Sequence, residues 1–143
     1  MPSFPLGSVR VTALRLGPGD DLKKEIEAAV SQLNLTAGFV LSVVGSLSAV
    51  RLRYAGKSEA SEVRGDLEIL SLGGTLTVLG GVHLHVSVSN GEGQCMGGHL
   101  LDGSIVRTTA EIVLGEAEEL RFTRAHDPAT GYKELQMSLR HEP

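Results

Sequence analysis

Hydrophobic and polar residues alternate with a period of two along most of the chain, and one segment near the N-terminus departs from this rule. Residues 8–16 (SVRVTALRL) set valine, alanine and leucine against arginine and threonine, which indicates a half-buried strand. In residues 20–34 the apolar side chains recur three or four positions apart, which predicts one main helix. Asp20 or Asp21 is placed to cap the start of this helix, and Asn34 to end it.

The rest of the chain is typical of strands separated by glycine-rich or polar turns. The expected strands cover residues 36–54, 66–79, 82–89, 94–101, 105–114, 120–124 and 133–140. Gly45 predicts a bulge or bend within the first of them. Gly73-Gly74 predicts a tight turn or sharp bend that divides the second into two pieces. Residues 57–65 (KSEASEVRG) are polar and are expected to form a loop.

Together these elements predict one α+β domain over residues 1–143. It has about seven mainly antiparallel strands, packed with one main helix (roughly residues 20–34). A chain of 143 residues with 41% hydrophobic residues can bury a single core. Arg51 and Arg53 alternate with apolar neighbours, so we expect them to form the solvent-facing side of their strand.

Charge and composition narrow the classes of partner. The net charge is −4 and the thirteen basic residues form no run, which does not favour direct binding of double-stranded DNA. Aromatic residues make up 3%, so the stacking platform of single-stranded nucleic-acid binders is lacking. A single cysteine excludes an internal disulfide framework. We expect no membrane partner and a cytoplasmic location, with a nuclear one left open, because the sequence shows no secretory pattern and no apolar run near ~18 residues.

Three of the five histidines and the only cysteine fall in one stretch in the middle of the chain. His83 and His85 are two positions apart, so on a strand both point to the same face. His99 joins them if the hairpin loop between the two strands has an odd number of residues, because the numbers of opposed residues then have an even sum. A two-residue Asn90-Gly91 turn would send His99 to the other face, whereas Gly93 favours a three-residue loop.

Three imidazoles that converge on one ion are typical of a catalytic zinc site, in which a fourth position is left for water. Such a site would also accept cobalt, nickel or copper. His83, His85 and His99 are therefore a candidate site for a divalent transition metal, at which a small molecule could be a further ligand. The alternative that the sequence leaves open is that the histidines act separately, each being a residue on a half-buried strand whose hydrogen bonds are satisfied without a metal.

Other reactive residues offer weaker candidates. Cys95 could be a fourth ligand or a nucleophile, but an unpaired cysteine is commonly a buried structural residue. Glu111 lies within an apolar strand and is a candidate general base beside a metal-bound water. His126 and His141 are expected to be surface residues.

Four segments of the chain are similar to those of one known family. They read LRLGPGDDL, VVGSLSAVRLR, LEILSLGGTL and HLHVSVS followed by GGHLLDGSIVRTTAEIVL. In these segments the chain resembles the PPC domain (plants and prokaryotes conserved) family, as a stand-alone prokaryotic-type member. The resemblance covers nearly the whole chain and implies a homotrimeric PPC-like fold with the site region near subunit interfaces.

The resemblance also implies a function. Prokaryotic-type members carry a zinc-like site of three histidines, at positions that match His83, His85 and His99. Plant members regulate transcription and contact DNA through AT-hooks with an Arg-Gly-Arg-Pro core, which this sequence lacks. We therefore expect a homotrimer that binds a divalent metal. Two alternatives stay open, a DNA-associated regulator or protein-interaction module and a metal-assisted hydrolase-like enzyme.

Overall fold

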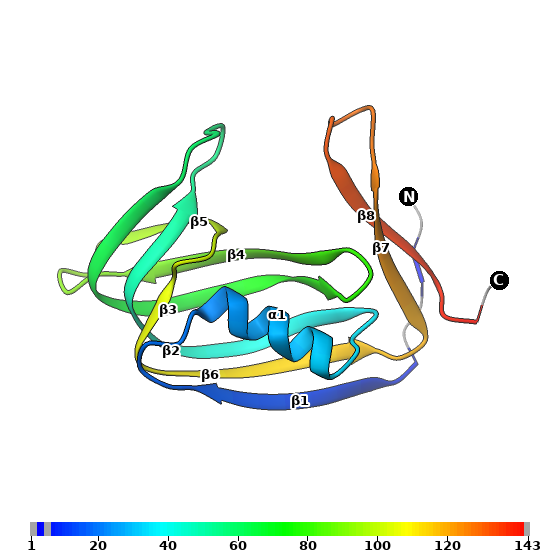
Figure 1. Cartoon of the computed structure of the whole chain (residues 1–143), viewed down its shortest axis with the longest axis horizontal. Coiled ribbons are helices and arrows are strands. Elements are labelled where there is room, and N and C mark those ends of the chain that lie inside the picture. Colours follow the sequence, from blue (N-terminus) through cyan, green and yellow to red (C-terminus); the bar gives the residue numbers. More distant parts are fainter. Residues whose placement is uncertain (1–2, 5–6, 142–143) are drawn as a thin grey trace.

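The computed structural model describes residues 3–4 and 7–141 of the chain. Within these residues it contains one helix and eight strands (Figure 1). In chain order they are β1 (Val9–Leu16), α1 (Leu22–Gln32), β2 (Gly38–Arg53), β3 (Ser61–Thr77), β4 (Gly81–Ser89), β5 (Cys95–Leu100), β6 (Ile105–Ala117), β7 (Leu120–His126) and β8 (Lys133–Leu139). This arrangement confirms the prediction of a small α+β domain with one main helix.

Six of the strands form one antiparallel sheet in the order β1-β6-β2-β3-β4-β5. The last strand is paired on both sides, because β5 also pairs with the end of β2 through Leu52↔Leu100 and Arg53↔His99. The register of β2 against β6 shifts on either side of Leu47, which confirms the irregularity predicted at neighbouring Gly45. β7 and β8 form a separate hairpin that projects from the sheet (Figure 1).

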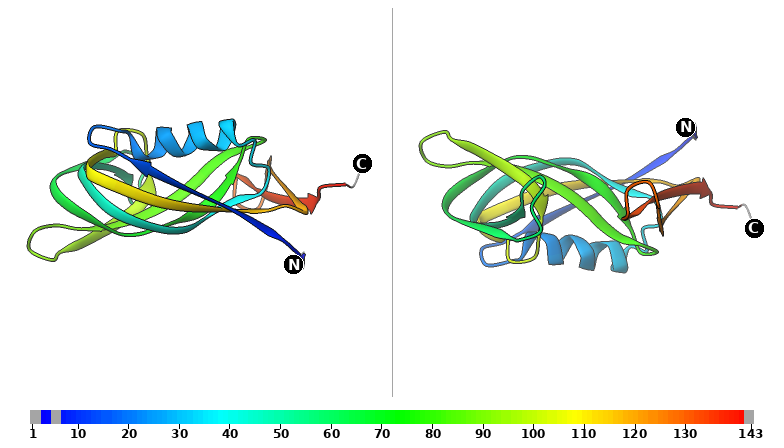
Figure 2. Two further views of the ribbon diagram at one scale, coloured as in Figure 1. Left: turned by 90° about the horizontal axis from the view of Figure 1, so that it is seen from below. Right: turned by 90° about the horizontal axis from the view of Figure 1, so that it is seen from above.

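Helix α1 begins and ends where the sequence predicted. The Asp21 side chain caps it by accepting a hydrogen bond from the Lys24 N–H (3.2 Å). After the helix, Asn34 has a left-handed φ of 51° and turns the chain toward β2. Figure 2 shows α1 lying across one face of the sheet, and the residues it buries there are Leu22, Ile26 and Val30. No helix among the described residues combines the length and the apolar character that crossing a membrane requires.

The main core lies between α1 and the sheet, and all six strands of the sheet contribute leucine, isoleucine, valine or alanine to it. A second, smaller cluster attaches the β7–β8 hairpin to the sheet through Ala37, Ala117, Leu120 and Phe122. Glu116 is buried beside this cluster, where it accepts the Thr36 N–H (3.0 Å) and pairs with the Arg10 guanidinium. Because both partners compensate the buried carboxylate, the base of the hairpin is tied to β1 and to the segment before β2.

The expectations for the third strand region were wrong in two places. Residues 61–65 belong to β3 rather than to a loop, and Gly73-Gly74 lie inside the same continuous strand rather than at a turn. Gly74 is needed for close approach of two strands, because a Cβ there would lie 1.9 Å from the backbone oxygen of His83. Gly74 is thus required by its contact with the neighbouring strand, and the sequence of a single segment does not reveal such a contact.

Replacing Gly74 by alanine is therefore expected to lower the free energy of unfolding by about 2–4 kcal/mol, since β3 and β4 must separate to admit the methyl group. Gly73→Ala is the matched control, because a Cβ at Gly73 meets nothing within 4 Å. It should change stability by less than about 1 kcal/mol. Urea unfolding of both variants in metal-free buffer measures the difference, and equal stabilities would contradict the close approach.

Candidate metal centre

The β4–β5 hairpin decides whether the three histidines meet. The Asn90 N–H donates to the Gln94 carbonyl (3.0 Å), which leaves Gly91, Glu92 and Gly93 as a three-residue loop. Gly93 has a left-handed φ of 78°, the conformation that such a loop requires at this position. The loop has an odd number of residues, so the prediction of a shared face is confirmed.

The register places His85 directly opposite His99, with His83 two residues before His85 on β4. One ring nitrogen from each histidine lies within 4.8 Å of one from each of the others. The Nε2 atoms of His83 and His85 are 3.1 Å apart, and the ring centroids are separated by 4.9, 5.2 and 5.7 Å. Tetrahedral zinc with Zn–N bonds near 2.0–2.1 Å holds its nitrogens about 3.4 Å apart. Small rotations of the side chains are therefore enough for all three to reach one ion.

The histidines lie on the face of β4 and β5 that points away from the main core. His83 and His85 are exposed and His99 is half-buried. The residues between and beside them on the other face, Leu84, Val86 and Leu100, are 1%, 3% and 0% exposed. The strand alternation thus anchors each imidazole through a neighbouring core residue, so the positions of the ligands are set by the packing of the sheet.

The surroundings keep two of the imidazoles unprotonated. Burial lowers the pKa of His99 to about 4, and the positive charge of Arg53 acts in the same direction. Burial also lowers the pKa of His83 from 6.5, with the charges of His85 and Arg124 adding to the effect. A neutral imidazole has the lone pair that a metal ion needs. At neutral pH the side chains of His83 and His99 are therefore able to act as metal ligands.

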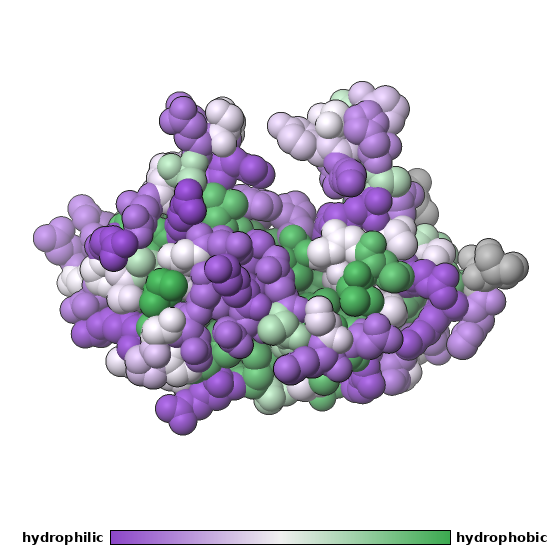
Figure 3. Space-filling view, viewed as in Figure 1, coloured by the Kyte–Doolittle hydropathy of each residue, from purple (hydrophilic) through white to green (hydrophobic). Residues whose placement is uncertain are grey.

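The three histidines form part of the lining of a cleft of about 1090 Å³. One wall is the loop after β2, residues 54–58, and the other is the β7–β8 hairpin, with Arg124 and residues 132–134. Figure 1 shows the two walls as projections that rise from the same side of the sheet. Figure 3 shows a hollow between them, with mainly hydrophilic residues on both projections.

Sequence reasoning did not assign the second wall to the site. Arg124, Tyr132 and Glu134 come from a hairpin far from the histidines in sequence, and no spacing pattern links the two segments. Arg53 was expected to face solvent, and it is exposed, but its strand pairing with β5 also places it beside His99. Only the alternation of strand β2 hinted at its direction.

The structure places the weaker candidates away from the three histidines. Glu111 lies on β6, opposite Arg15 and Val44, and is exposed outside the cleft. Cys95 is exposed beside the hairpin loop, four positions before His99, a separation of about 13 Å along a strand. The carboxylates that do line the cleft are Glu27 and Glu134.

The two remaining histidines lie elsewhere. His126 ends β7 and His141 follows β8, and both are exposed. The expectation that they are surface residues is confirmed.

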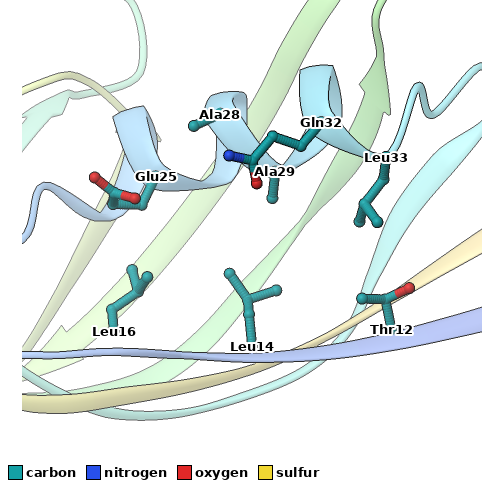
Figure 4. A pocket seen from close by; sticks show the side chains of 8 residues that line it. All are labelled: Thr12, Leu14, Leu16, Glu25, Ala28, Ala29, Gln32 and Leu33. Carbon is teal, nitrogen blue, oxygen red and sulfur yellow. The ribbon is translucent and has the colours of Figure 1, made fainter.

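A second hollow of about 300 Å³ lies between α1 and β1. Figure 4 shows Leu14 and Leu16 of β1 facing Ala29 of α1 and Leu33, the residue directly after the helix, across it. Glu25 is the one charged residue in its lining. The hollow is a gap in the packing beneath the helix rather than a convergence of reactive groups, so the histidine cleft is the candidate site.

Comparison with protein families agrees with the fold. Residues 5–118 match the model of the Plants and Prokaryotes Conserved (PCC) domain. Since the match spans most of the chain, the chain belongs to the Plants and Prokaryotes Conserved domain family, and the family resemblance seen in the sequence is confirmed.

Individual relatives extend this result. The chain is 53% and 52% identical, over 132 residues, to segments of the bifunctional protein GlmU from two Synechococcus strains. The matched segment covers 92% of this chain and 21% of each relative, so the chain spans about a fifth of their length. The similarity therefore concerns this one domain.

Two solved structures share the whole fold. A hypothetical protein from Salmonella cholerae-suis is 42% identical with a TM-score of 0.91, covering 93% of this chain and 96% of that one. A protein from Archaeoglobus fulgidus that is described as metal-containing is 28% identical with a TM-score of 0.76, covering 95% and 99%. The chain thus shares its fold with these two solved proteins over nearly its whole length.

The lowered pKa of His99 predicts how the metal-free protein responds to acid. Unfolded His99 takes up a proton near pH 6.5, whereas the folded side chain stays neutral until about pH 4. The unfolded state therefore binds more protons between these values, and stability falls as the pH is lowered from 6.5 toward 4. Urea unfolding at pH 7 and pH 5.5 should show a smaller loss in His99→Gln than in the unchanged protein. An identical loss in both would contradict the shift.

Proposed function

We propose that this protein binds one divalent transition metal ion, zinc or a zinc-like ion, through His83, His85 and His99. The observation that carries the proposal is the convergence of three ring nitrogens within 4.8 Å on the floor of a large cleft. The lowered pKa values of His83 and His99 support it, because both side chains keep their lone pairs at neutral pH. The metal-containing relative from Archaeoglobus fulgidus supports it as well.

The composition of the ligand set favours a reactive rather than a purely structural ion. Structural zinc sites have four protein ligands, whereas sites with three leave one position for water or a substrate. Among the described residues, the three histidines form a group of metal ligands without a carboxylate or thiolate within reach. A bound ion would act there as a Lewis acid toward a small molecule that enters the cleft.

We also propose that the protein assembles as a homotrimer, as the family resemblance implies. The support in this chain is the face of the sheet opposite α1, which Figure 2 shows without a covering element. Apolar side chains on the β1 and β2 part of that face are 43–57% exposed, namely Val9, Val11, Leu41 and Val44. A patch of exposed apolar residues on one face of a sheet is typical of a protein interface, and a second copy of this chain is the occupant that we propose.

Metal analysis of protein purified without chelators is expected to show about one zinc-like ion per chain. Adding zinc at a hundred times its Kd to the metal-free protein should raise the free energy of unfolding by about 2.7 kcal/mol. His99→Ala removes one of three ligands, so the affinity for zinc should fall by more than about 100-fold, since loss of a group that merely hydrogen-bonds to a ligand already lowers metal affinity by about 10- to 100-fold.

The matched control for this experiment is His126→Ala, since His126 is an exposed histidine outside the cluster. It should bind zinc with unchanged affinity. Metal-free protein that zinc does not stabilise, or equal zinc affinity in the two variants, would contradict the three-histidine site.

Light scattering tests the assembly and is expected to give about three times the chain mass of 15.1 kDa. Val11→Glu introduces a charge on the exposed apolar face and should shift the protein toward monomers. Ala60→Glu, in the loop after β2, adds the same charge away from that face and should leave the trimer intact. A monomer mass for the unchanged protein would refute the assembly.

A further inference from the structure

The cleft is locally basic although the protein as a whole is acidic. Its lining contains four basic side chains, Arg53, Lys57, Arg124 and Lys133, against two carboxylates. The net charge of the chain is −4. A cleft lined mainly by positively charged side chains attracts anions. This cleft therefore favours anionic ligands, and a bound divalent metal ion would add to its positive charge.

Two arginines flank the histidine cluster from opposite sides. Arg53 on β2 is paired directly with His99 on β5. Arg124 on β7 donates a hydrogen bond to Thr75 Oγ1 (2.8 Å), and Thr75 lies opposite His83 in the register of β3 and β4. Both arginines therefore line the same cleft as the three histidines.

Neither arginine is neutralised within the part of the chain that the structure describes. The ion pairs there join Arg10–Glu116, Lys23–Glu27, Lys23–Asp102, Arg64–Glu62 and Arg107–Asp66, and none involves a basic side chain of the cleft. Guanidinium groups bind carboxylate and phosphate oxygens through paired hydrogen bonds. Two unpaired arginines beside a metal site are thus suited to a ligand that carries such an oxyanion.

The tyrosines of the chain point to an organic ligand rather than a bare ion. The sequence contains two tyrosines, and both Tyr54 and Tyr132 line this cleft. They come from opposite walls, the loop after β2 and the β7–β8 hairpin, and Tyr132 is 72% exposed. Tyrosine offers an apolar ring with a polar tip, so the walls can contact the carbon skeleton of a ligand whose anionic group lies on the floor.

We propose that this cleft binds a small organic anion, with its carboxylate or phosphate group between Arg53 and Arg124 and directed at the metal. The proposal rests on the metal site proposed above and names the class of ligand for it. Arg53 and Arg124 bind the oxyanion, and Tyr54 and Tyr132 contact the rest of the molecule. A volume of about 1090 Å³ is ample for a small metabolite.

Cobalt-substituted protein provides a test that needs no enzymatic activity. The visible absorption bands of protein-bound cobalt change when an anion enters its coordination sphere, so titration gives a Kd directly. The probes are inorganic phosphate, phenyl phosphate and benzoate, titrated at constant ionic strength because charged ligands respond to screening. We expect phenyl phosphate or benzoate to bind saturably and more tightly than inorganic phosphate. Whichever of phenyl phosphate and benzoate has the lower Kd identifies the preferred oxyanion as phosphate or carboxylate.

Variants assign the binding to the arginines. Arg53→Gln and Arg124→Gln should each raise the Kd by tenfold or more, the effect of losing a charge-assisted hydrogen bond. Arg124→Lys keeps the charge without the paired donors, so its Kd should be intermediate. Tyr132→Ala should raise the Kd for phenyl phosphate and leave the Kd for inorganic phosphate unchanged. The control is Arg64→Gln, which alters an exposed arginine outside the cleft and should have no effect.

The metal content of every sample separates the two proposals. If cobalt and zinc do not bind, the metal site itself is wrong. If the metal binds in all variants but none of the three anions perturbs the cobalt bands at millimolar concentration, the anion site is refuted while the metal site stands. Equal anion affinities in the unchanged protein, Arg53→Gln and Arg124→Gln would refute it in the same way.

Discussion

The register between β4 and β5 is the constraint on which the rest of the site depends. It sets His85 opposite His99 and leaves His83 on the same face. A slip by one residue would turn His99 toward the core and bring the buried Leu100 to the outer face, because side chains alternate along a strand. The three-residue loop with Gly93 in a left-handed conformation selects the observed register. The chemistry of the cleft therefore begins with the geometry of one hairpin.

The pairings around β5 connect this chemistry to the stability of the fold. A Cβ at Gly97 or Gly98 would lie 2.6 or 2.7 Å from a backbone oxygen of the adjacent strand, so these glycines allow β5 to fit closely between β4 and the end of β2. That position brings Arg53 beside His99. The same backbone contacts that close the edge of the sheet thus assemble both a metal-binding cluster and one of its cationic neighbours.

The second wall of the cleft depends on a different set of interactions. The buried cluster around Phe122 and the compensated carboxylate of Glu116 hold the base of the β7–β8 hairpin. Thr77 Oγ1 also donates to the Phe122 carbonyl (2.8 Å). These contacts place Arg124 within hydrogen-bonding distance of Thr75. An acidic protein thereby acquires a basic cleft, because residues from separate hairpins meet over the histidines.

The helix, most of the strands and the shared face of His83 and His85 could be predicted from the amino-acid sequence, because they follow from the periodicity of neighbouring residues. From the sequence, the face on which His99 lies depended on the length of the hairpin loop. Gly93 indicated a three-residue loop, and this prediction is confirmed. The folded chain was needed to show that β3 continues through Gly73-Gly74, and that Arg53 and Arg124, rather than Glu111, line the cleft with the histidines. These features arise from contacts between segments far apart in the chain, and local alternation carries no information about which distant strand or hairpin will be the partner.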